Sequence, residues 1–382
     1  MIDNRQLLNI KNKLSSAAVL KNLQSCIQNK ELSKEDLKTL LSEDGNLIDV
    51  RSALYLLKEG FLLREDFVGC GIDKEFIDLV EKEQTPIDPS DGTAFVPIES
   101  IAPNATEVYF WGVPSSGKSC ALGAVMSVAN GSDYVMIQDT CQGRDYMNRL
   151  SSLFEYDGCY TFLPQGTRVT NTYEMRFSLT QNDKEHPLAF IDLSGELFTC
   201  LYKKQVGDAL SDEEGMAFDT LKTILVEHAS KNRKIHFFVI EYGGEDRLFN
   251  GLKPDVYLQR AAEYLDSLGV FTEYTDAIYI ILTKADRVDG FFSYTDDVKS
   301  TFHNYMSNNY FGFYKALRKM CKTHSINGGK LEFVPFSIGK VCLRRLCRFD
   351  SSSAKEILNI IVDRSFYYEK SRWGNVKKWL RK

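Results

Sequence analysis

Apolar and amphipathic stretches alternate along the chain from about residue 106 onward. Short apolar runs predict six strands, at 107–111, 172–180, 188–192, 235–242, 277–282 and 331–336. Amphipathic stretches with apolar residues three and four apart predict helices at 215–229, 255–268, 296–322 and 354–370. Strands that alternate with helices are typical of an α/β domain with a mostly parallel sheet, here of six strands.

Two of the predicted strands differ from the others. Only a short polar turn at 182–184 separates the run at 172–180 from the run at 188–192. A parallel crossover needs a dozen or more residues, so these two strands should pair in an antiparallel hairpin.

The first 83 residues predict a small all-helical domain. Residues 33–36 (Ser-Lys-Glu-Asp) have the pattern of a capping box at a helix start. Residues 84–104 contain four prolines and several turn-forming residues, which predicts a linker. The second domain then covers residues 105–382. We find no catalytic chemistry in residues 1–83 and expect a helical adaptor domain there.

Composition limits the classes of function. The chain has 382 residues, a hydrophobic content of 43% and a formal net charge of −5, which argues against nucleic-acid binding by the whole surface. The first residues carry no apolar signal region, and no apolar stretch reaches the length of a membrane span. Nine scattered cysteines without a C-x-x-C pair fit reduced thiols, so we expect a cytoplasmic protein.

One eight-residue segment carries the strongest chemical signal. Gly112-Val113-Pro114-Ser115-Ser116-Gly117-Lys118-Ser119 matches G-x-x-x-x-G-K-[ST], the phosphate-binding P-loop or Walker A motif. The glycines let backbone N–H groups point at a polyphosphate, Lys118 adds a positive charge, and Ser119 offers a hydroxyl to Mg²⁺. A predicted strand precedes the motif and a helix follows it, as the motif requires. The expected nucleotide contacts here are Gly112, Ser115, Ser116, Gly117, Lys118, Ser119 and Cys120.

A second motif, Asp192-Leu193-Ser194-Gly195, ends a predicted strand. The carboxylate of Asp192 can lie opposite Ser119 in a Mg²⁺ shell. Gly195 can offer its backbone N–H to a γ-phosphate, because no side chain blocks the approach.

Two further segments predict a site for the base. Thr283-Lys284-Ala285-Asp286 matches [NT]-K-x-D, in which a carboxylate accepts hydrogen bonds from N1–H and the 2-amino group of guanine. Adenine has neither donor there, so a buried Asp286 would stay unpaired against ATP. The alternative is an aspartate that caps a helix after a strand. A loop N–H at Ser337 or Ile338, after the next strand, can meet the guanine O6.

The order of these motifs resembles that of the Ras-like, translation-factor-class P-loop GTPases, over residues 106–370. Within that class, residues 163–167 and 192–196 resemble bacterial "double-GTPase"-type GTPases, many of which are encoded beside conflict systems. The resemblance implies a Ras-like sheet with one antiparallel edge strand and the nucleotide at the carboxyl ends of the strands. It also implies GTP or GDP and Mg²⁺ as cofactors.

The resemblance further implies a switch threonine that binds Mg²⁺ when a γ-phosphate is present. We expect Thr167, in a Gly-containing loop before the hairpin, with Thr170 as the alternative. A surface turn is the structural alternative for either residue. The expected metal ligands are Ser119, Thr167 and Asp192, and the expected catalytic residues are Lys118, Thr167 and Glu196.

Glu196 departs from the family pattern, which usually has glutamine directly after D-x-x-G. A carboxylate can accept a proton from water but cannot donate to the γ-phosphate, so we expect slow, partner-regulated hydrolysis. Arg168 is a candidate arginine finger or else a solvent-exposed arginine. The main hypothesis is therefore a GTP-hydrolysing molecular switch. A nucleotide-binding scaffold without turnover and a P-loop ATPase are the alternatives.

Three segments bear on partners. Residues 132–162 predict an inserted helix that gates the site or binds a partner. The basic tail at 370–382 suits an anionic membrane or a partner, but a domain-closing helix with a solvated end fits it better. We expect a guanine nucleotide, an unidentified effector through the helical domain and no nucleic acid; a homodimer stays open. Three arginines after the last predicted strand should cover the surface: Arg344, Arg345 and Arg348.

Overall fold

The computed structural model describes residues 4–14, 18–80, 98–133, 135–137, 143–154, 161–164, 171–181, 184–249, 251–288, 291 and 296–379. The chain divides into two compact units. The helical unit comprises Met1–Asp88, Leu153–Leu163 and Gly339–Asp350. The sheet unit comprises Pro89–Ser152, Pro164–Ile338 and Ser351–Lys382.

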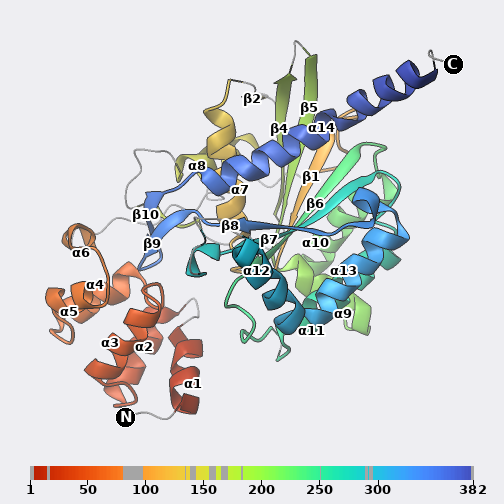
Figure 1. Cartoon of the computed structure of the whole chain (residues 1–382). Helices are drawn as coiled ribbons and strands as arrows, with labels where there is room; N and C mark the ends of the chain where they lie inside the picture. Colours follow the sequence, from red (N-terminus) through yellow and green to blue (C-terminus); the bar gives the residue numbers. More distant parts are fainter. Residues whose placement is uncertain are drawn as a thin grey trace. The chain divides into compact units, whose positions relative to one another are not determined.

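The helical unit is built from short amphipathic helices and a small sheet (Figure 1). Its helices are α1 (Asn4–Leu14), α2 (Val19–Gln28), α3 (Lys34–Glu43), α4 (Val50–Lys58), α5 (Arg64–Gly69) and α6 (Lys74–Val80). Its strands are β3 (Thr161–Phe162), β9 (Gly339–Cys342) and β10 (Arg345–Phe349), all antiparallel. The predicted capping box is confirmed, because Ser33 accepts from the Asp36 N–H at 3.2 Å and Asp36 accepts from the Ser33 N–H.

The hairpin β9–β10 belongs to the core of the helical unit. Cys342, Leu343 and Cys347 are buried in one cluster with the leucines of the helices. The predicted boundary, with everything after residue 105 in one domain, does not anticipate this grouping. Residues 84–97 of the predicted linker at 84–104 lie outside the described residues.

Arg344 ties the hairpin to the helices. Its backbone is left-handed, with φ +59°, and its guanidinium donates to the carbonyls of Leu14 at 2.8 Å and Leu47 at 3.2 Å. Arg345 is buried, and only Arg348 is exposed. The expectation of three surface arginines was therefore wrong for Arg344 and Arg345, because residues 339–349 form a hairpin that packs against helices.

The sheet unit contains a seven-stranded sheet in the order β2-β4-β5-β1-β6-β7-β8. Its strands are β1 (Thr106–Trp111), β2 (Val135–Ile137), β4 (Thr172–Gln181), β5 (Lys184–Leu193), β6 (Arg233–Glu241), β7 (Thr275–Thr283) and β8 (Glu332–Phe336). Strands β5, β1, β6, β7 and β8 are parallel, whereas β4 is antiparallel to both β5 and β2. The predicted Ras-like α/β fold with a mostly parallel sheet and an antiparallel hairpin is confirmed.

Two details of that prediction were wrong. Within the described residues the sheet has seven strands, and the prediction missed β2 because three residues are too few to stand out in the sequence pattern. Since β2 pairs with the outer side of β4, the antiparallel strand β4 is interior and β2 forms the edge.

Helices cover both faces of the sheet (Figure 1). On one face, α9 (Leu197–Val206), α11 (Pro254–Ser267) and α13 (Phe311–Thr323) pack together, and α10 (Asp212–Lys222), with a π-helical turn at Thr223–Glu227, lies beside α9. On the other face, α7 (Lys118–Asn130) contacts α8 (Arg144–Ser152) and α14 (Ser352–Trp379). The predicted helix at 296–322 is two helices, α12 (Asp296–Asn309) and α13, because the backbone leaves the helical region at Tyr310.

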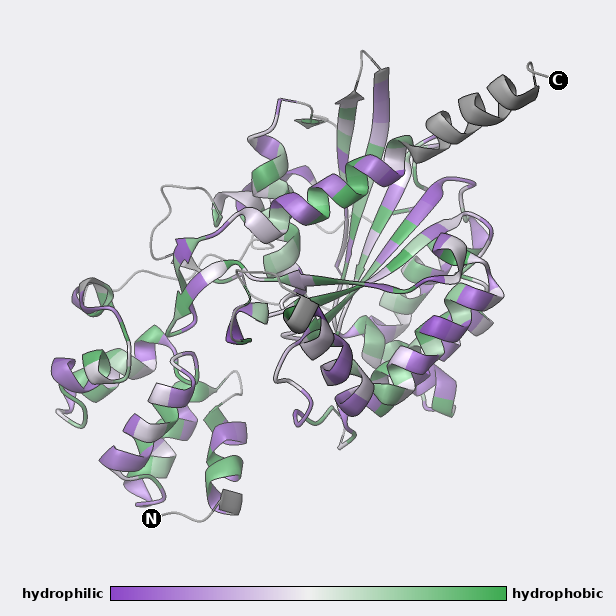
Figure 2. Ribbon diagram, viewed as in Figure 1, coloured by the Kyte–Doolittle hydropathy of each residue, from purple (hydrophilic) through white to green (hydrophobic). Residues whose placement is uncertain are grey.

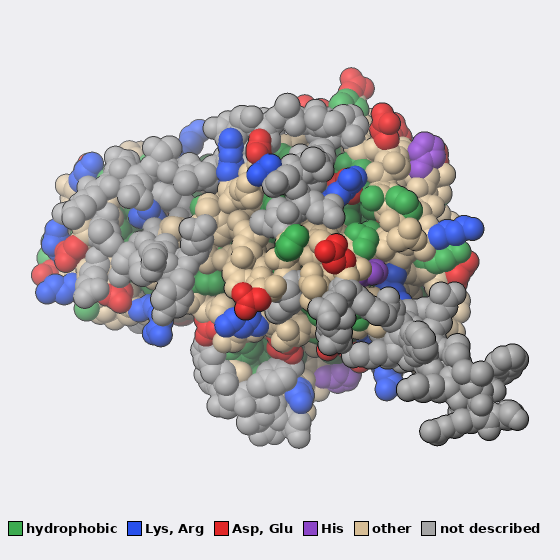
Figure 3. Space-filling model, turned by 90° about the horizontal axis from the view of Figure 1, so that it is seen from above, with side chains coloured by type: hydrophobic (Ala, Val, Ile, Leu, Met, Phe, Trp, Pro, Cys, Tyr) green, Lys and Arg blue, Asp and Glu red, His purple; other side chains and the backbone are tan. Residues whose placement is uncertain are grey.

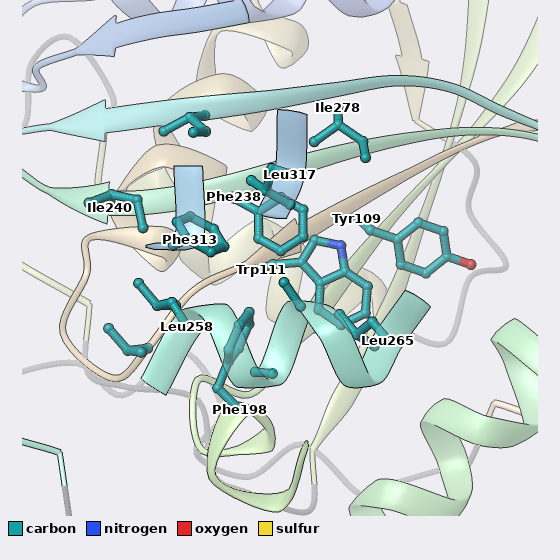
Figure 4. Packing of buried hydrophobic residues seen from close by; sticks show 14 of the residues in the cluster. Tyr109, Trp111, Phe198, Phe238, Ile240, Leu258, Leu265, Ile278, Phe313 and Leu317 are labelled. Atoms are coloured by element: carbon teal, nitrogen blue, oxygen red, sulfur yellow. The ribbon is translucent and has the colours of Figure 1, made fainter. Parts of the chain in front are cut away.

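The core of the sheet unit is rich in aromatic residues. Hydrophobic residues run along the strands and the helix faces beside them (Figure 2). Trp111 is buried between the sheet and Phe198 of α9, with Leu265 and Phe313 nearby (Figure 4). Its indole N–H donates to Nδ1 of His236 at 2.9 Å, so its one polar atom is satisfied. Packing in this core fixes the position of β1 and therefore of the loop that follows it.

The described surface carries both signs of charge. On the face in Figure 3, acidic and basic side chains are interspersed instead of gathered by sign. Within the described residues, no helix is long and apolar enough to cross a membrane.

Candidate functional site

The loop from Gly112 to Gly117 connects the fully buried strand β1 to helix α7. Gly117 has φ +89°, and a Cβ there would lie 3.1 Å from the side chain of Thr283. A Cβ at Gly112 would lie 2.5 Å from Oγ of Ser116 and 3.0 Å from the Val239 carbonyl oxygen. Both glycines of the motif are therefore required by the close packing of the curled backbone.

Lys118 and Asp192 form a buried ion pair at this loop. Nζ of Lys118, in the first turn of α7, contacts Oδ1 of Asp192 near the end of β5. Only 6% of the lysine side chain and none of the aspartate are exposed. The phenol of Tyr146, on α8, donates to Oδ2 of the same carboxylate at 2.7 Å. Ser119 and Cys120 are half-buried in the same turn of α7.

The D-x-x-G segment lies directly against the P-loop. A Cβ at Gly195 would come within 2.8 Å of the Pro114 nitrogen and 3.0 Å of the Val113 carbonyl carbon. Glu196 follows at the start of α9 with an exposed side chain, and its N–H donates to Oγ of Ser194 at 3.2 Å. Glycine at 195 is thus needed for two backbone segments to approach each other.

Thr283 joins the [NT]-K-x-D segment to the P-loop. Its hydroxyl donates to the Ser116 carbonyl at 2.6 Å, and the residue is buried. Lys284 has a left-handed backbone with φ +57° and pairs with Glu241 at the end of β6. Asp286 follows in a short 3-10 turn and is exposed. A buried Asp286 was expected from the sequence, but the side chain is exposed, so a bound base itself would have to cover this carboxylate.

Glu241 and Arg247 extend this network, and sequence reasoning missed both. Glu241 also pairs with Arg247 at 2.6 Å, and Nη1 of Arg247 lies 3.5 Å from the Ser115 carbonyl oxygen. A charged residue at the carboxyl end of an apolar run was the available signal for Glu241. No sequence pattern marks Arg247.

Ser337 and Ile338 follow β8. Because β7 and β8 are parallel, with Thr283 opposite Phe336, this loop leaves the sheet at the same edge as the [NT]-K-x-D segment. Ser337 is buried and its N–H donates to Oγ of Ser353 at 3.2 Å. That bond leaves the N–H of half-buried Ile338 as the better candidate to meet a ligand.

The predicted switch residues Thr167 and Thr170, and Arg168 between them, lie outside the described residues, so their roles stay predictions. Within the described part of the chain, no three His, Cys, Asp or Glu side chains come together in a group that could hold a metal ion. The predicted inserted helix is present as α8.

Every predicted site residue that is described lies at the carboxyl edge of the parallel strands. The curled glycine loop after the central strand, the buried lysine–aspartate pair and the strand order together define a Ras-like P-loop α/β domain.

Two solved structures are similar to this chain at low identity. The structure of Methanosarcina barkeri Roco2 RocCORdC bound to GDP is 9% identical, with a TM-score of 0.29, over 72% of this chain and 51% of that one. The nucleolar GTP-binding protein 1 of Plasmodium falciparum is 14% identical, with a TM-score of 0.29, over 74% of this chain and 100% of that one. The chain thus spans about half the length of the Roco2 structure. No protein-family model and no curated protein matches the chain.

Proposed function

We propose that this chain binds guanine nucleotides at the P-loop and hydrolyses GTP slowly, as a Mg²⁺-dependent molecular switch. The observation that carries the proposal is the hydrogen bond from Thr283 to the Ser116 carbonyl at 2.6 Å. It holds the segment with the base-selecting carboxylate against the phosphate-binding loop. The two ends of one nucleotide can therefore be recognised at the same time.

The P-loop would bind the phosphates through its backbone N–H groups and Lys118. Nζ of Lys118 now contacts Asp192, and this partner would be exchanged for the β- and γ-phosphates. A lysine held by a single carboxylate can make that exchange because both partners are anionic oxygens. Gly195 would offer its N–H to the γ-phosphate from the segment that touches Pro114.

The donors near the P-loop fit Mg²⁺. Asp192 supplies a buried carboxylate and Ser119 a hydroxyl, both hard oxygen ligands. Mg²⁺ is usually held by one or two side chains together with the phosphates, so no larger cluster of carboxylates is required. When bound, the ion would neutralise negative charge on the β- and γ-phosphates. Thr167 is the proposed third ligand.

The base would be selected by Asp286, with Lys284 along its plane and the Ile338 N–H at O6. Covering Asp286 with adenine would leave a desolvated carboxylate without donors, which costs roughly 100-fold or more in affinity. Asp286→Asn should shift preference from guanosine to xanthosine nucleotides. Because Asp286 is exposed, the variant should fold normally. Unchanged preference in competition binding would contradict the assignment.

Hydrolysis is expected to be slow because Glu196 stands where the family has glutamine. A carboxylate at this place repels the γ-phosphate and cannot donate to it. This same residue supports the second candidate function, a scaffold that binds nucleotide without turnover. Multiple-turnover release of phosphate from GTP separates the two, since the scaffold would release none.

Arg168→Ala in a single-turnover assay tests whether Arg168 acts as the arginine finger. An unchanged rate of hydrolysis would exclude that role.

The decisive experiment is a titration of the purified chain with fluorescent GDP, GTP and ATP, with Mg²⁺ and with EDTA. We expect tight guanine-nucleotide binding that Lys118→Ala weakens strongly. The matched control is Lys315→Ala, a lysine in helix α13 outside the site. Binding of ATP as tight as that of GTP would support the P-loop ATPase. Absence of any nucleotide binding would refute the proposal.

The helical unit is the proposed contact for a protein effector, because the proposed phosphate-binding residues all belong to the sheet unit. A homodimer and a cytoplasmic location are two further proposals, and both come from the sequence alone.

A further inference from the structure

We propose that Tyr146, which belongs to none of the sequence motifs, is a positioning residue that aims Asp192 at Mg²⁺. The inference rests on the proposed function and names a residue of the same site. Its phenol donates to Oδ2 of Asp192 at 2.7 Å, while Lys118 contacts Oδ1. Tyr146 is 2% exposed and Asp192 is 0% exposed. Solvent therefore contributes little to holding this carboxylate, and Lys118 and Tyr146 are two of the groups that fix its orientation.

The ring of Tyr146 is fixed by strand β4. It stacks on Tyr173 with the ring centroids 3.9 Å apart and the planes within 9°. Tyr173 is the direct β-sheet partner of Asp192, and its own hydroxyl accepts from Nδ2 of Asn171 at 2.8 Å. The phenol of Tyr146 thus reaches Asp192 while its ring is stacked on Tyr173, the residue paired with Asp192 on the neighbouring strand.

The start of helix α8 is fixed on the same strand. The N–H of Gly143 donates to the Glu174 carbonyl at 2.8 Å, and the Met147 N–H donates to the Gly143 carbonyl at 2.8 Å. A Cβ at Gly143 would lie 2.8 Å from the Glu174 carbonyl oxygen. Tyr146 therefore cannot leave Asp192 by a small shift of α8 along β4.

The two oxygens of Asp192 then have different roles. Lys118 must turn to the phosphates when nucleotide binds, which releases Oδ1, whereas Tyr146 can keep Oδ2. A hydrogen bond kept at one oxygen would restrict the rotation of the carboxylate and leave the other oxygen for a bound Mg²⁺. Groups that orient a metal ligand in this way typically contribute 10- to 100-fold to metal affinity.

The test is Tyr146→Phe, which removes one hydroxyl and keeps the stacked ring. We measure fluorescent GDP binding against Mg²⁺ concentration and, separately, in EDTA. The Mg²⁺ concentration at half-effect should rise about 10-fold or more, while the affinity for GDP in EDTA stays unchanged. Tyr279→Phe is the control, since it removes a phenol of the sheet unit that bonds Arg364 at 3.0 Å. A purely structural role would lower the thermal stability without separating the two affinities.

A second variant guards against misfolding of the first. Gly143→Ala displaces α8 through the contact with Glu174 and leaves the chemistry of Tyr146 intact, so it should raise the Mg²⁺ requirement in the same direction. Adding Tyr146→Phe to Asp192→Ala should have no further effect on the Mg²⁺ requirement. An unchanged or a lowered Mg²⁺ requirement in Tyr146→Phe would overturn the inference. Loss of guanine-nucleotide binding by the unaltered chain would instead refute the proposed function.

Discussion

At the scale of single residues, the site depends on a few side chains that satisfy buried backbone groups. Thr283 is the main example. Its hydroxyl donates to the Ser116 carbonyl at 2.6 Å and lies 3.3 Å from the Ile240 carbonyl oxygen. A buried carbonyl without a donor costs about 1–3 kcal/mol. The [NT]-K-x-D motif therefore contributes to the shape of the P-loop, in addition to its proposed role in recognising the base.

Thr283→Val should destabilise the P-loop while keeping the volume of the side chain. We expect a loss of about 1–3 kcal/mol in the free energy of unfolding and weaker binding of both GDP and GTP. Urea unfolding and nucleotide titration measure the two effects. Thr275→Val, at the opposite end of β7, is the control; its hydroxyl accepts from the Thr272 N–H at 3.2 Å. Equal nucleotide affinity for Thr283→Val and the unaltered chain would contradict the role.

His236 makes stability depend on pH. Burial lowers its pKa to about 3, and the nearby positive charge of Lys234 acts in the same direction. An unfolded histidine has a pKa near 6.5, so between pH 6.5 and pH 3 the unfolded chain binds a proton that the folded chain does not. Stability should therefore fall as the pH falls through this window, by up to roughly 1.4 kcal/mol per pH unit.

His236→Gln tests this dependence. The amide oxygen can still accept from the Trp111 indole, which lies 2.9 Å from Nδ1 of His236. Urea unfolding of both proteins from pH 7 to pH 4.5 should show the stability advantage of the unaltered chain shrinking with acidity. Parallel stability curves over that range would exclude His236 as the cause.

At the scale of elements, the junction between β5 and α9 touches the P-loop. Gly195→Ala would place a Cβ 2.8 Å from the Pro114 nitrogen, so one backbone segment must move. Because Gly195 is proposed to serve the γ-phosphate, GTP affinity should fall more than GDP affinity, roughly 10-fold for the loss of one charge-assisted hydrogen bond. Titration with the two nucleotides measures the ratio.

The control for this glycine is Gly215→Ala in α10. No atom of the described residues is recorded within 4 Å of a Cβ built there, and alanine is the better helix former by about 1 kcal/mol. Gly215→Ala should leave the ratio of the GTP affinity to the GDP affinity unchanged. A ratio that does not change in Gly195→Ala would argue against a γ-phosphate contact at this residue.

Periodicity identified most elements but not their interruptions. The run at 296–322 has one continuous helical pattern, yet Tyr310 has φ −130° and divides it. The Tyr310 side chain is buried beside Tyr305, with ring centroids 5.8 Å apart. Tertiary packing outweighs the local helical preference there. Strand β2 was missed for a related reason, because three residues acquire strand structure only through pairing with β4.

At the scale of the whole molecule, the helical unit takes segments from three distant parts of the chain. Arg344 contributes through its contacts with the Leu14 and Leu47 carbonyls. Arg344→Ala should therefore destabilise the helical unit by about 2–3 kcal/mol, because carbonyls that bond a charged group lose their donor. Arg348→Ala, in the same hairpin but exposed, should change stability by less than about 0.5 kcal/mol.

Hydrogen exchange of the amides in α2 to α4 measures the effect of Arg344→Ala without requiring global unfolding. Faster exchange should be confined to the helical unit, with the sheet unit and nucleotide binding unchanged. If Arg344→Ala accelerates exchange equally in both units, the hairpin does not stabilise the helical unit alone.

The sequence alone determined the P-loop, the order of the motifs and the Ras-like α/β class. These depend on short-range features, namely glycines at fixed spacing, a strand before and a helix after, and apolar runs of strand length. Tertiary structure decided the contacts that no spacing records. Tyr146 reaches Asp192, Glu241 bridges Lys284 and Arg247, and the hairpin at 339–349 joins helices some 300 residues earlier. The physical reason is that such contacts arise when separate elements pack, and the side chains involved have no local pattern until they meet.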